Sequence, residues 1–183
     1  MSETWFWADT HFGHANIMKY CGRPFQSVEE MDEILVARWN ERVKAGDTIY
    51  FLGDFMFTKH RTDPETMLQR LNGHKFLVIG NHDKKYTRKA TGWECTYRLH
   101  DITIDNQFIM LCHYPMFSWD KSCHGSWMIH GHCHGTLQTS PTYAGVDFGS
   151  LLIKDVGVDV CPYPLSFGEI RSEMNGKTTS LTI

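Results

Sequence analysis

The amino-acid sequence predicts an α/β fold in which helices cover β-sheets. Three observations support this prediction. The first half of the chain alternates strand-like apolar runs with helical patterns, the second half is rich in strand-like runs, and no repeat or linker divides the 183 residues. We therefore expect a single domain over residues 1–183, with parallel strand pairing in the first half and mixed pairing in the second.

The predicted strands are short apolar runs, several of which end in polar residues. Such runs are typical of strands that are buried on both faces of a sheet. Two polar segments, residues 114–126 and 135–150, read as loops between the later strands. The predicted strands are, in order, residues 4–9, 47–54, 75–83, 101–105, 107–115, 126–134 and 151–160.

Two helices are expected between the first three strands. Ser27 and Glu30 have the spacing of a capping box, and apolar residues then recur every three or four positions until Gly46. Asp63, followed by a proline, opens a shorter helix that ends at Gly73. These helices have the length and position of crossovers between parallel strands.

Composition and charge exclude several classes of protein. A net charge of −3 provides no bulk positive field for binding duplex nucleic acid or anionic membranes. No apolar run approaches the roughly 20 residues that a membrane helix needs. The six cysteines form no C-x-x-C pair, and the N-terminus lacks the features of a signal peptide. We expect a cytoplasmic protein with reduced thiols, no membrane and no obligate protein partner.

Carboxylate, imidazole and amide side chains gather at the ends of the predicted strands. Any one of these short motifs is more often a simple turn, but their recurrence at successive strand ends is not expected by chance. Because ligands bind outside the carboxyl ends of strands in α/β sheets, we expect the side chains to meet at one rim. This donor set suits a pair of divalent metal ions. Its members are Asp9, His11, Asp54, Asn81, His82, Asp83, His113, His132 and His134.

The order of these motifs resembles the calcineurin-like metallophosphoesterase superfamily. The signature of that family is D-x-H, G-D, G-N-H-D, a single H and G-H-x-H, and all of these are present in this order. The segments "DTHFGHANI", "RPF", "HYP" and "DVGVD" resemble those of short single-domain bacterial and phage members. The resemblance covers most of the chain and implies a four-layer αββα sandwich of two mixed sheets flanked by helices.

The resemblance also implies ligand roles for two divalent ions, which could be manganese, iron, zinc or nickel. Asp54 would bridge the two ions. His82 would be a general acid near the substrate phosphate, and Asp83 is a second catalytic candidate. The first ion would be held by Asp9, His11 and His134, and the second by Asn81, His113 and His132.

The chain departs from the larger phosphoprotein phosphatases after Gly53-Asp54. Those enzymes carry a spaced D-R-G that orients the catalytic histidine, whereas Phe55, Met56 and Phe57 follow here. The partner that orients His82 is therefore not identified, and phosphoprotein specificity is not expected. Asp155 and Asp159 could orient ligand histidines through their second ring nitrogen.

We expect hydrolysis of phosphoesters by in-line attack of a hydroxide that bridges the two ions. A diester is slightly favoured. Cations at 84–89 ("KKYTRK") and 59–61 ("KHR") suit a nucleotide or single-stranded nucleic acid. Candidate substrate contacts are His14, Arg23, Lys84 and Lys85. The alternatives are a phosphomonoesterase of the same fold, a non-catalytic metal-binding scaffold, and a single-zinc hydrolase of amides or esters.

Overall fold

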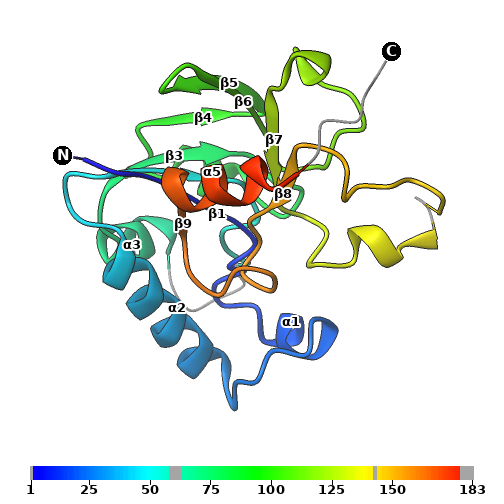
Figure 1. Ribbon diagram of the computed structural model, residues 1–183. Helices are drawn as coiled ribbons and strands as arrows, with labels where there is room; N and C mark the ends of the chain where they lie inside the picture. The colour runs from blue at the N-terminus through cyan, green and yellow to red at the C-terminus, as the bar shows by residue number, and fades with distance from the viewer. Residues whose placement is uncertain (1, 58–62, 142–143, 178–183) are drawn as a thin grey trace.

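The computed structural model describes residues 2–57, 63–141 and 144–177, whose strands form two sheets (Figure 1). The strands are β1 (Thr4–Trp7), β2 (Thr48–Phe51), β3 (His74–Val78), β4 (Cys95–Tyr97), β5 (Leu99–Ile104), β6 (Gln107–Cys112), β7 (Trp127–His130), β8 (Ile153–Asp155) and β9 (Leu165–Ser166). The helices are α1 (Ala15–Tyr20), α2 (Val28–Arg42), α3 (Pro64–Gln69), α4 (Lys85–Lys89) and α5 (Phe167–Asn175).

The first sheet has the strand order β4-β3-β2-β1-β9. Strands β1 to β4 pair in parallel, as expected for the alternating first half of the chain. The late strand β9 joins the edge of this sheet antiparallel to β1. The first sheet is therefore mixed, and its central strands all deliver their carboxyl ends to the same rim.

The second sheet has the order β5-β6-β7-β8. Strands β5 and β6 form an antiparallel hairpin, whereas β6, β7 and β8 pair in parallel. This arrangement confirms the mixed pairing predicted for the second half. It places the carboxyl ends of β6 and β7 side by side, where His113 and the G-H-x-H motif begin.

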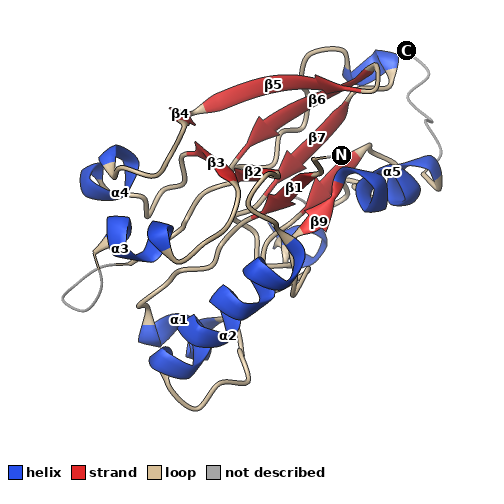
Figure 2. Cartoon of the chain, turned by 90° about the vertical axis from the view of Figure 1, so that its left-hand side faces the viewer, coloured by secondary structure: helices blue, strands red, loops and turns tan. Residues whose placement is uncertain are grey.

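Three clusters of buried apolar residues separate the layers of the sandwich. The first lies between α2, α3 and the first sheet, and includes Met31, Trp39 and Phe51. Figure 2 shows α2 and α3 on the side of the first sheet that faces away from β5 to β7. The second cluster fills the space between the two sheets, with Leu52 and Ile129 among its members.

A third cluster covers the outer face of the second sheet, where Met110 and Met128 pack against Trp119, Leu137 and Phe148. In the described part of the chain, this outer layer consists of loops with 3₁₀ turns at Ser122–His124 and Leu137–Thr139. The described residues of the loops predicted at 114–126 and 135–150 therefore form the fourth layer of the sandwich. Their lack of helical periodicity explains why these described residues form no long helix.

The predicted long helix is present with different limits. Ser27 caps α2 through its hydroxyl oxygen, which accepts the backbone N–H of Glu30 at 3.2 Å. The helix ends at Arg42, before Gly46, because Val43 turns into an extended conformation. The side chain of Asp47 accepts the backbone N–H of Lys44 at 2.9 Å and stabilises this turn. No helix among the described residues is long and apolar enough to cross a membrane.

Candidate metal centre

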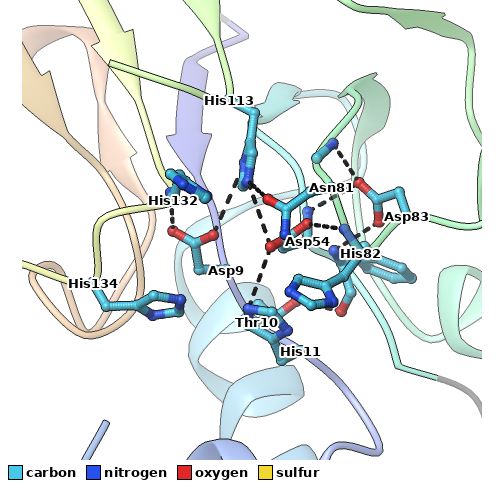
Figure 3. Close-up of polar contacts among 12 residues, drawn as sticks. Asp9, Thr10, His11, Asp54, Asn81, His82, Asp83, His113, His132 and His134 are labelled. Carbon is cyan, nitrogen blue, oxygen red and sulfur yellow. Dashed lines mark hydrogen bonds and ion pairs between the residues drawn. The ribbon is translucent and has the colours of Figure 1, made fainter. Parts of the chain in front are cut away.

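The loops that follow β1, β2, β3, β6 and β7 meet at one edge of the two sheets (Figure 3). Backbone hydrogen bonds tie them together. The N–H of Asp9 donates to the carbonyl of Gly53 at 3.0 Å, and the N–H of Gly131 donates to that of His113 at 3.1 Å. The strand-end residues that lie far apart in the sequence are thereby brought to one rim, as the sequence predicted.

Two groups of side chains at this rim have the geometry of metal sites. In the first, Asp9, His11 and His134 each offer a ligand atom within 4.8 Å of the other two. In the second, Asp54, His113 and His132 do the same. Asn81 belongs beside the second group, because its Oδ1 lies 3.0 Å from Nε2 of His113.

The Asp54 carboxylate lies between the two groups. Its Oδ2 is 3.6 Å from Nε2 of His11 in the first group and 3.4 Å from Nε2 of His113 in the second. Its Oδ1 accepts the backbone N–H of His82 at 2.8 Å, which fixes the orientation of the carboxylate. One carboxylate oxygen within reach of both groups is the arrangement that a bridging ligand requires.

Backbone strain is concentrated at these candidate ligands. Non-glycine residues seldom adopt a positive φ, which costs of order 1–3 kcal/mol each and persists where the surroundings enforce it. Most of the described non-glycine residues with a positive φ belong to the two groups. They are Asp9 (φ 60°), His11 (φ 51°), Asp54 (φ 56°), His132 (φ 71°) and His134 (φ 47°).

Glycines in the motifs leave room for the carboxylates. A Cβ on Gly131 would lie 2.7 Å from Oδ2 of Asp9, closer than real contacts allow. A Cβ on Gly80 would collide with the Asp54 carboxylate and with its backbone nitrogen. The glycines of the G-N-H-D and G-H-x-H motifs are therefore required sterically, because they lie next to the candidate ligands Asp54 and Asp9.

Unsatisfied buried atoms show that the donor set fits divalent cations. Oδ1 of Asp9 and both ring nitrogens of His11 are buried and have no hydrogen-bond partner among the described residues. Such groups are rare in folded proteins, because each would lose its interaction with water without compensation. A cation bound between them would compensate Oδ1 of Asp9 and one ring nitrogen of His11 at once.

The pKa values of these residues set their protonation states in the metal-free centre. Burial raises the pKa of Asp9 to about 7 and lowers the pKa of His11 to about 3. His11 is therefore neutral, which is the form that binds a metal. Burial alone would raise the pKa of Asp54, but its hydrogen bond with His113 lowers it to about 2 and keeps the carboxylate ionised.

Asp159, which is itself bound by Arg23, holds His134 of the first group in place by a hydrogen bond. Nδ1 of His134 donates to Oδ2 of Asp159 at 2.6 Å, which realises the expected orienting role for this carboxylate. Burial opposes protonation of His134, but the hydrogen bond to Asp159 raises its pKa to about 10. Asp155 has other partners, since its carboxylate accepts the backbone N–H groups of Gly157 and Gly135 at 2.8 and 3.3 Å.

The expectation that Arg23 contacts substrate phosphate is wrong. The side chain is buried, and its guanidinium donates to both carboxylate oxygens of Asp159 at 2.7 and 2.8 Å. It also donates to the carbonyls of Asp9 at 2.7 Å and Thr10 at 2.9 Å, and to the sulfur of Met31 at 3.5 Å. All five guanidinium N–H groups are thus used inside the protein.

Asp83 also has a structural role in place of the expected catalytic one. Its buried carboxylate accepts the backbone N–H groups of Gly80 at 2.8 Å, Asp54 at 2.9 Å and Phe55 at 2.9 Å. These bonds tie the loop after β2 to the loop after β3. The sequence motif alone could not reveal this, because the partners are backbone groups of another loop.

His82 and His14 lie at the open side of the centre. The half-buried His82 ring packs against the rings of His11 and Phe57, with centroids 5.4 and 6.1 Å away. His14 stacks on Phe57 at 4.2 Å. The exposed Lys84 and Lys85 follow the same loop at the start of α4, whereas residues 59–61 lie outside the described part of the chain.

Sequence reasoning missed Asp32 in α2. Its carboxylate accepts the backbone N–H of Gly13 at 3.0 and 3.1 Å and so holds the loop that follows His11. Burial raises the pKa of Asp32 to about 6. No motif connects the two positions, because the helix and the loop meet only in the folded chain.

The fold and the site together define a protein with a candidate two-metal centre at the strand ends of an αββα sandwich. Residues 3–161 match the family described as calcineurin-like phosphoesterase, and the chain belongs to that family. This membership supports hydrolysis of phosphoesters as the general class of activity.

The chain is similar to several known proteins over most of their length. The chain is 40% identical to an uncharacterized protein of Methanocaldococcus jannaschii over 73% of this chain and 70% of that protein. It is 26% identical to the gene 66 protein of Mycobacterium phage L5, over 85% of this chain and 92% of that protein. A protein of unknown function from Aquifex aeolicus has the same fold, with a TM-score of 0.73 and 24% identity, covering 94% of this chain and 99% of that one.

Proposed function

We propose that the chain is a phosphodiesterase that uses two divalent metal ions. The observation that carries this proposal is the position of the Asp54 carboxylate, with one oxygen 3.6 Å from His11 and 3.4 Å from His113. A single-zinc hydrolase needs three protein ligands and one open position. Such an enzyme would use one of the two groups as metal ligands, and the other group would bind no metal.

The ligands of the proposed centre follow from the two groups. Asp54 would contact both ions, and the others would be divided between Asp9, His11 and His134 on one side and Asn81, His113 and His132 on the other. When bound, a pair of divalent ions neutralises charge on phosphoryl oxygens and lowers the pKa of water toward 7.

His82 is the proposed general acid. Its ring lies at the mouth of the centre, and its backbone is fixed by the hydrogen bond to Asp54. Aromatic packing against His11 and Phe57 restricts the ring, so that its imidazole can present a proton to the oxygen of the leaving group. A positioned acid of this kind typically contributes about 10²- to 10⁴-fold to the rate.

The diester preference is supported by the basic surface next to His82. Lys84 and Lys85 are exposed at the start of α4, and Lys89 is exposed at its end. Such cations can hold the phosphates of a nucleotide or a short single-stranded nucleic acid. Replacing Lys84, Lys85 and Lys89 with serine should raise KM for an oligonucleotide and flatten the salt dependence of that KM. Turnover of a small diester whose ester groups carry no charge should stay the same.

The first experiment supplies metal-free protein with manganese, zinc, nickel, iron or magnesium in turn. We expect hydrolysis of bis-p-nitrophenyl phosphate to exceed that of p-nitrophenyl phosphate, with two ions bound per chain at full activity. Faster hydrolysis of the monoester would replace the diester assignment with a phosphomonoesterase. Two bound ions without turnover of either ester would indicate a non-catalytic scaffold.

A second experiment tests the role of His82. The variant His82→Ala should keep both ions and lose roughly 10²-fold or more in kcat on a diester with a poor leaving group. The loss should shrink with p-nitrophenolate, because this leaving group needs little protonation. Equal losses on both substrates would assign His82 to phosphate positioning.

A further inference from the structure

A cavity of about 540 Å³ opens directly beside the candidate metal centre. One wall is formed by Ile17, Tyr20 and Cys21 from α1 and the residue that follows it. The opposite wall is formed by the segment that begins with His132 and includes Leu137. Figure 1 shows α1 in blue below this yellow segment, which comes from the other half of the chain. The volume is in the range of pockets that hold small organic ligands.

The cavity is uncharged apart from the metal-centre histidines. Ile17 and Leu137, which are largely buried, contribute apolar side chains to its walls. The described lining contains no lysine, arginine, aspartate or glutamate. A second phosphate would find no countercharge here, whereas a neutral organic group would be accommodated.

Tyr20 offers a flat surface at this cavity. It is the last residue of α1, and 74% of its surface is exposed. Its ring lies edge-on to that of His14, with centroids 6.3 Å apart. One face of a ring held in this way is available for stacking on a planar group.

Both walls are anchored to the metal centre. Arg23 follows the first wall closely in sequence and binds Asp159, which in turn holds His134 in the second wall. Thr136 also donates its hydroxyl to the carbonyl of Cys133 at 2.7 Å. The cavity is therefore built into the same hydrogen-bond network that positions the first group of ligands.

We propose that this cavity binds the uncharged aromatic arm of a phosphodiester substrate, a nucleoside or aryl group, with Tyr20 as its stacking surface. This inference rests on the proposed phosphodiesterase function and adds the chemical class of one ester group. Figure 3 shows His134 and His82 on opposite sides of Asp9 and Asp54. The arm beside His134 is therefore the one retained on the product phosphate, while the group beside His82 leaves.

The kinetic experiment uses three p-nitrophenyl phosphodiesters that share one leaving group and one charge. Their second arms are methyl, phenyl and thymidine-5′. We expect kcat/KM for the phenyl and thymidine esters to exceed that for the methyl ester by about 10-fold, as stacking on an aromatic side chain allows. Tyr20→Ser should reduce this ratio toward one, and Tyr20→Phe should preserve it because the ring remains. Phe117→Ser, which alters a ring that is 72% exposed outside the cavity lining, should leave the ratio unchanged.

A binding measurement gives a readout that does not depend on turnover. Calorimetry on the metal-loaded protein compares methyl phosphate, phenyl phosphate and thymidine 5′-monophosphate, which are the products that keep each arm. The two aromatic products should bind about 10-fold more tightly than methyl phosphate, and Tyr20→Ser should remove the difference. Tighter binding of the thymidine compound than of phenyl phosphate would identify the arm as a nucleoside.

The possible outcomes test the cavity proposal separately from the proposed phosphodiesterase function. If all three esters are hydrolysed with equal kcat/KM and all three products bind equally, the cavity proposal is overturned while the phosphodiesterase function stands. If no ester is hydrolysed, the proposed function fails, and the calorimetric ratio alone decides whether the cavity selects aromatic phosphates.

Discussion

Replacing Arg23 with lysine tests the central physical claim about the metal centre. The guanidinium joins both oxygens of Asp159 to the carbonyls of Asp9 and Thr10. Lysine keeps the positive charge but has three donors on one tetrahedral nitrogen. It cannot reach the four oxygens that the planar guanidinium reaches in its present position.

The magnitude follows from the bonds that are lost. At least two buried hydrogen bonds from a charged donor disappear, each contributing about 1.5–3 kcal/mol, and retention of the charge limits the total. We expect the free energy of unfolding to fall by about 2–4 kcal/mol. With a urea m-value near 2 kcal/mol/M, the unfolding midpoint should fall by about 1–2 M. Because Asp159 would no longer be held against His134, metal affinity at the first group should fall about 10- to 100-fold.

The assay combines urea unfolding in the presence of a chelator with a metal titration against a chromophoric competitor. Arg70→Lys is the matched control, because Arg70 pairs with Glu33 at 2.6 Å on the exposed surface. Such a surface pair contributes at most about 1 kcal/mol, so this control should remain close to the parent protein. Arg23→Lys behaving like Arg70→Lys in both measurements would refute the reasoning.

Three further predictions concern the ligands themselves. Asp54→Ala should lose both ions and all activity, and two tightly bound ions in this variant, measured by elemental analysis, would contradict the bridging role. Gly80→Ala should lower the free energy of unfolding, measured by urea denaturation, by about 2 kcal/mol or more, because the added Cβ would overlap the Asp54 carboxylate. An unchanged urea midpoint would show that the carboxylate leaves room for this Cβ. In the metal-free protein, hydrogen bonds to Asp54 and Asp159 outweigh burial and raise the pKa of His113 to about 8 and of His134 to about 10. Both are therefore protonated at pH 7, and Asp9, with a pKa of about 7, is about half protonated. Full metal loading should therefore release between two and three protons per chain and weaken as pH falls, as calorimetry in buffers of different ionisation enthalpy would show. Loading without proton release would exclude this account.

Several features of the fold were accessible from the sequence because they depend on local patterns. Short apolar runs with polar ends predicted the strands, and the Ser27–Glu30 spacing predicted the start of α2, where the Ser27 cap is present. The short helices α1 and α4 were not predicted, since five or six residues are too few for an apolar periodicity to emerge. Strand β9 has two residues and pairs with β1 from the opposite end of the chain, so it had no recognisable signal either.

The gathering of the candidate ligands was also predictable, because parallel strands deliver their carboxyl ends to one rim whatever the details of packing. Positions such as Asp9, Asp54 and His113 follow directly from that rule. The left-handed backbone at Asp9 and Asp54 did not follow from it, since aspartate gives no sequence signal for a positive φ in the way that glycine does.

The sequence by itself determined most of the strands along the chain, the motifs at their ends and the family to which they belong. Only the tertiary structure decided what Arg23 and Asp83 do, because their partners are carbonyls, amides and a carboxylate supplied by other loops. Arg23 and Asp159 are separated by 136 positions, and Asp83 and Asp54 by 29. The first contact depends on how the two halves of the chain pack together, and the second depends on how neighbouring loops of one sheet meet. In sequence, a charged residue beside a motif looks the same whether it faces substrate or is buried beneath the site.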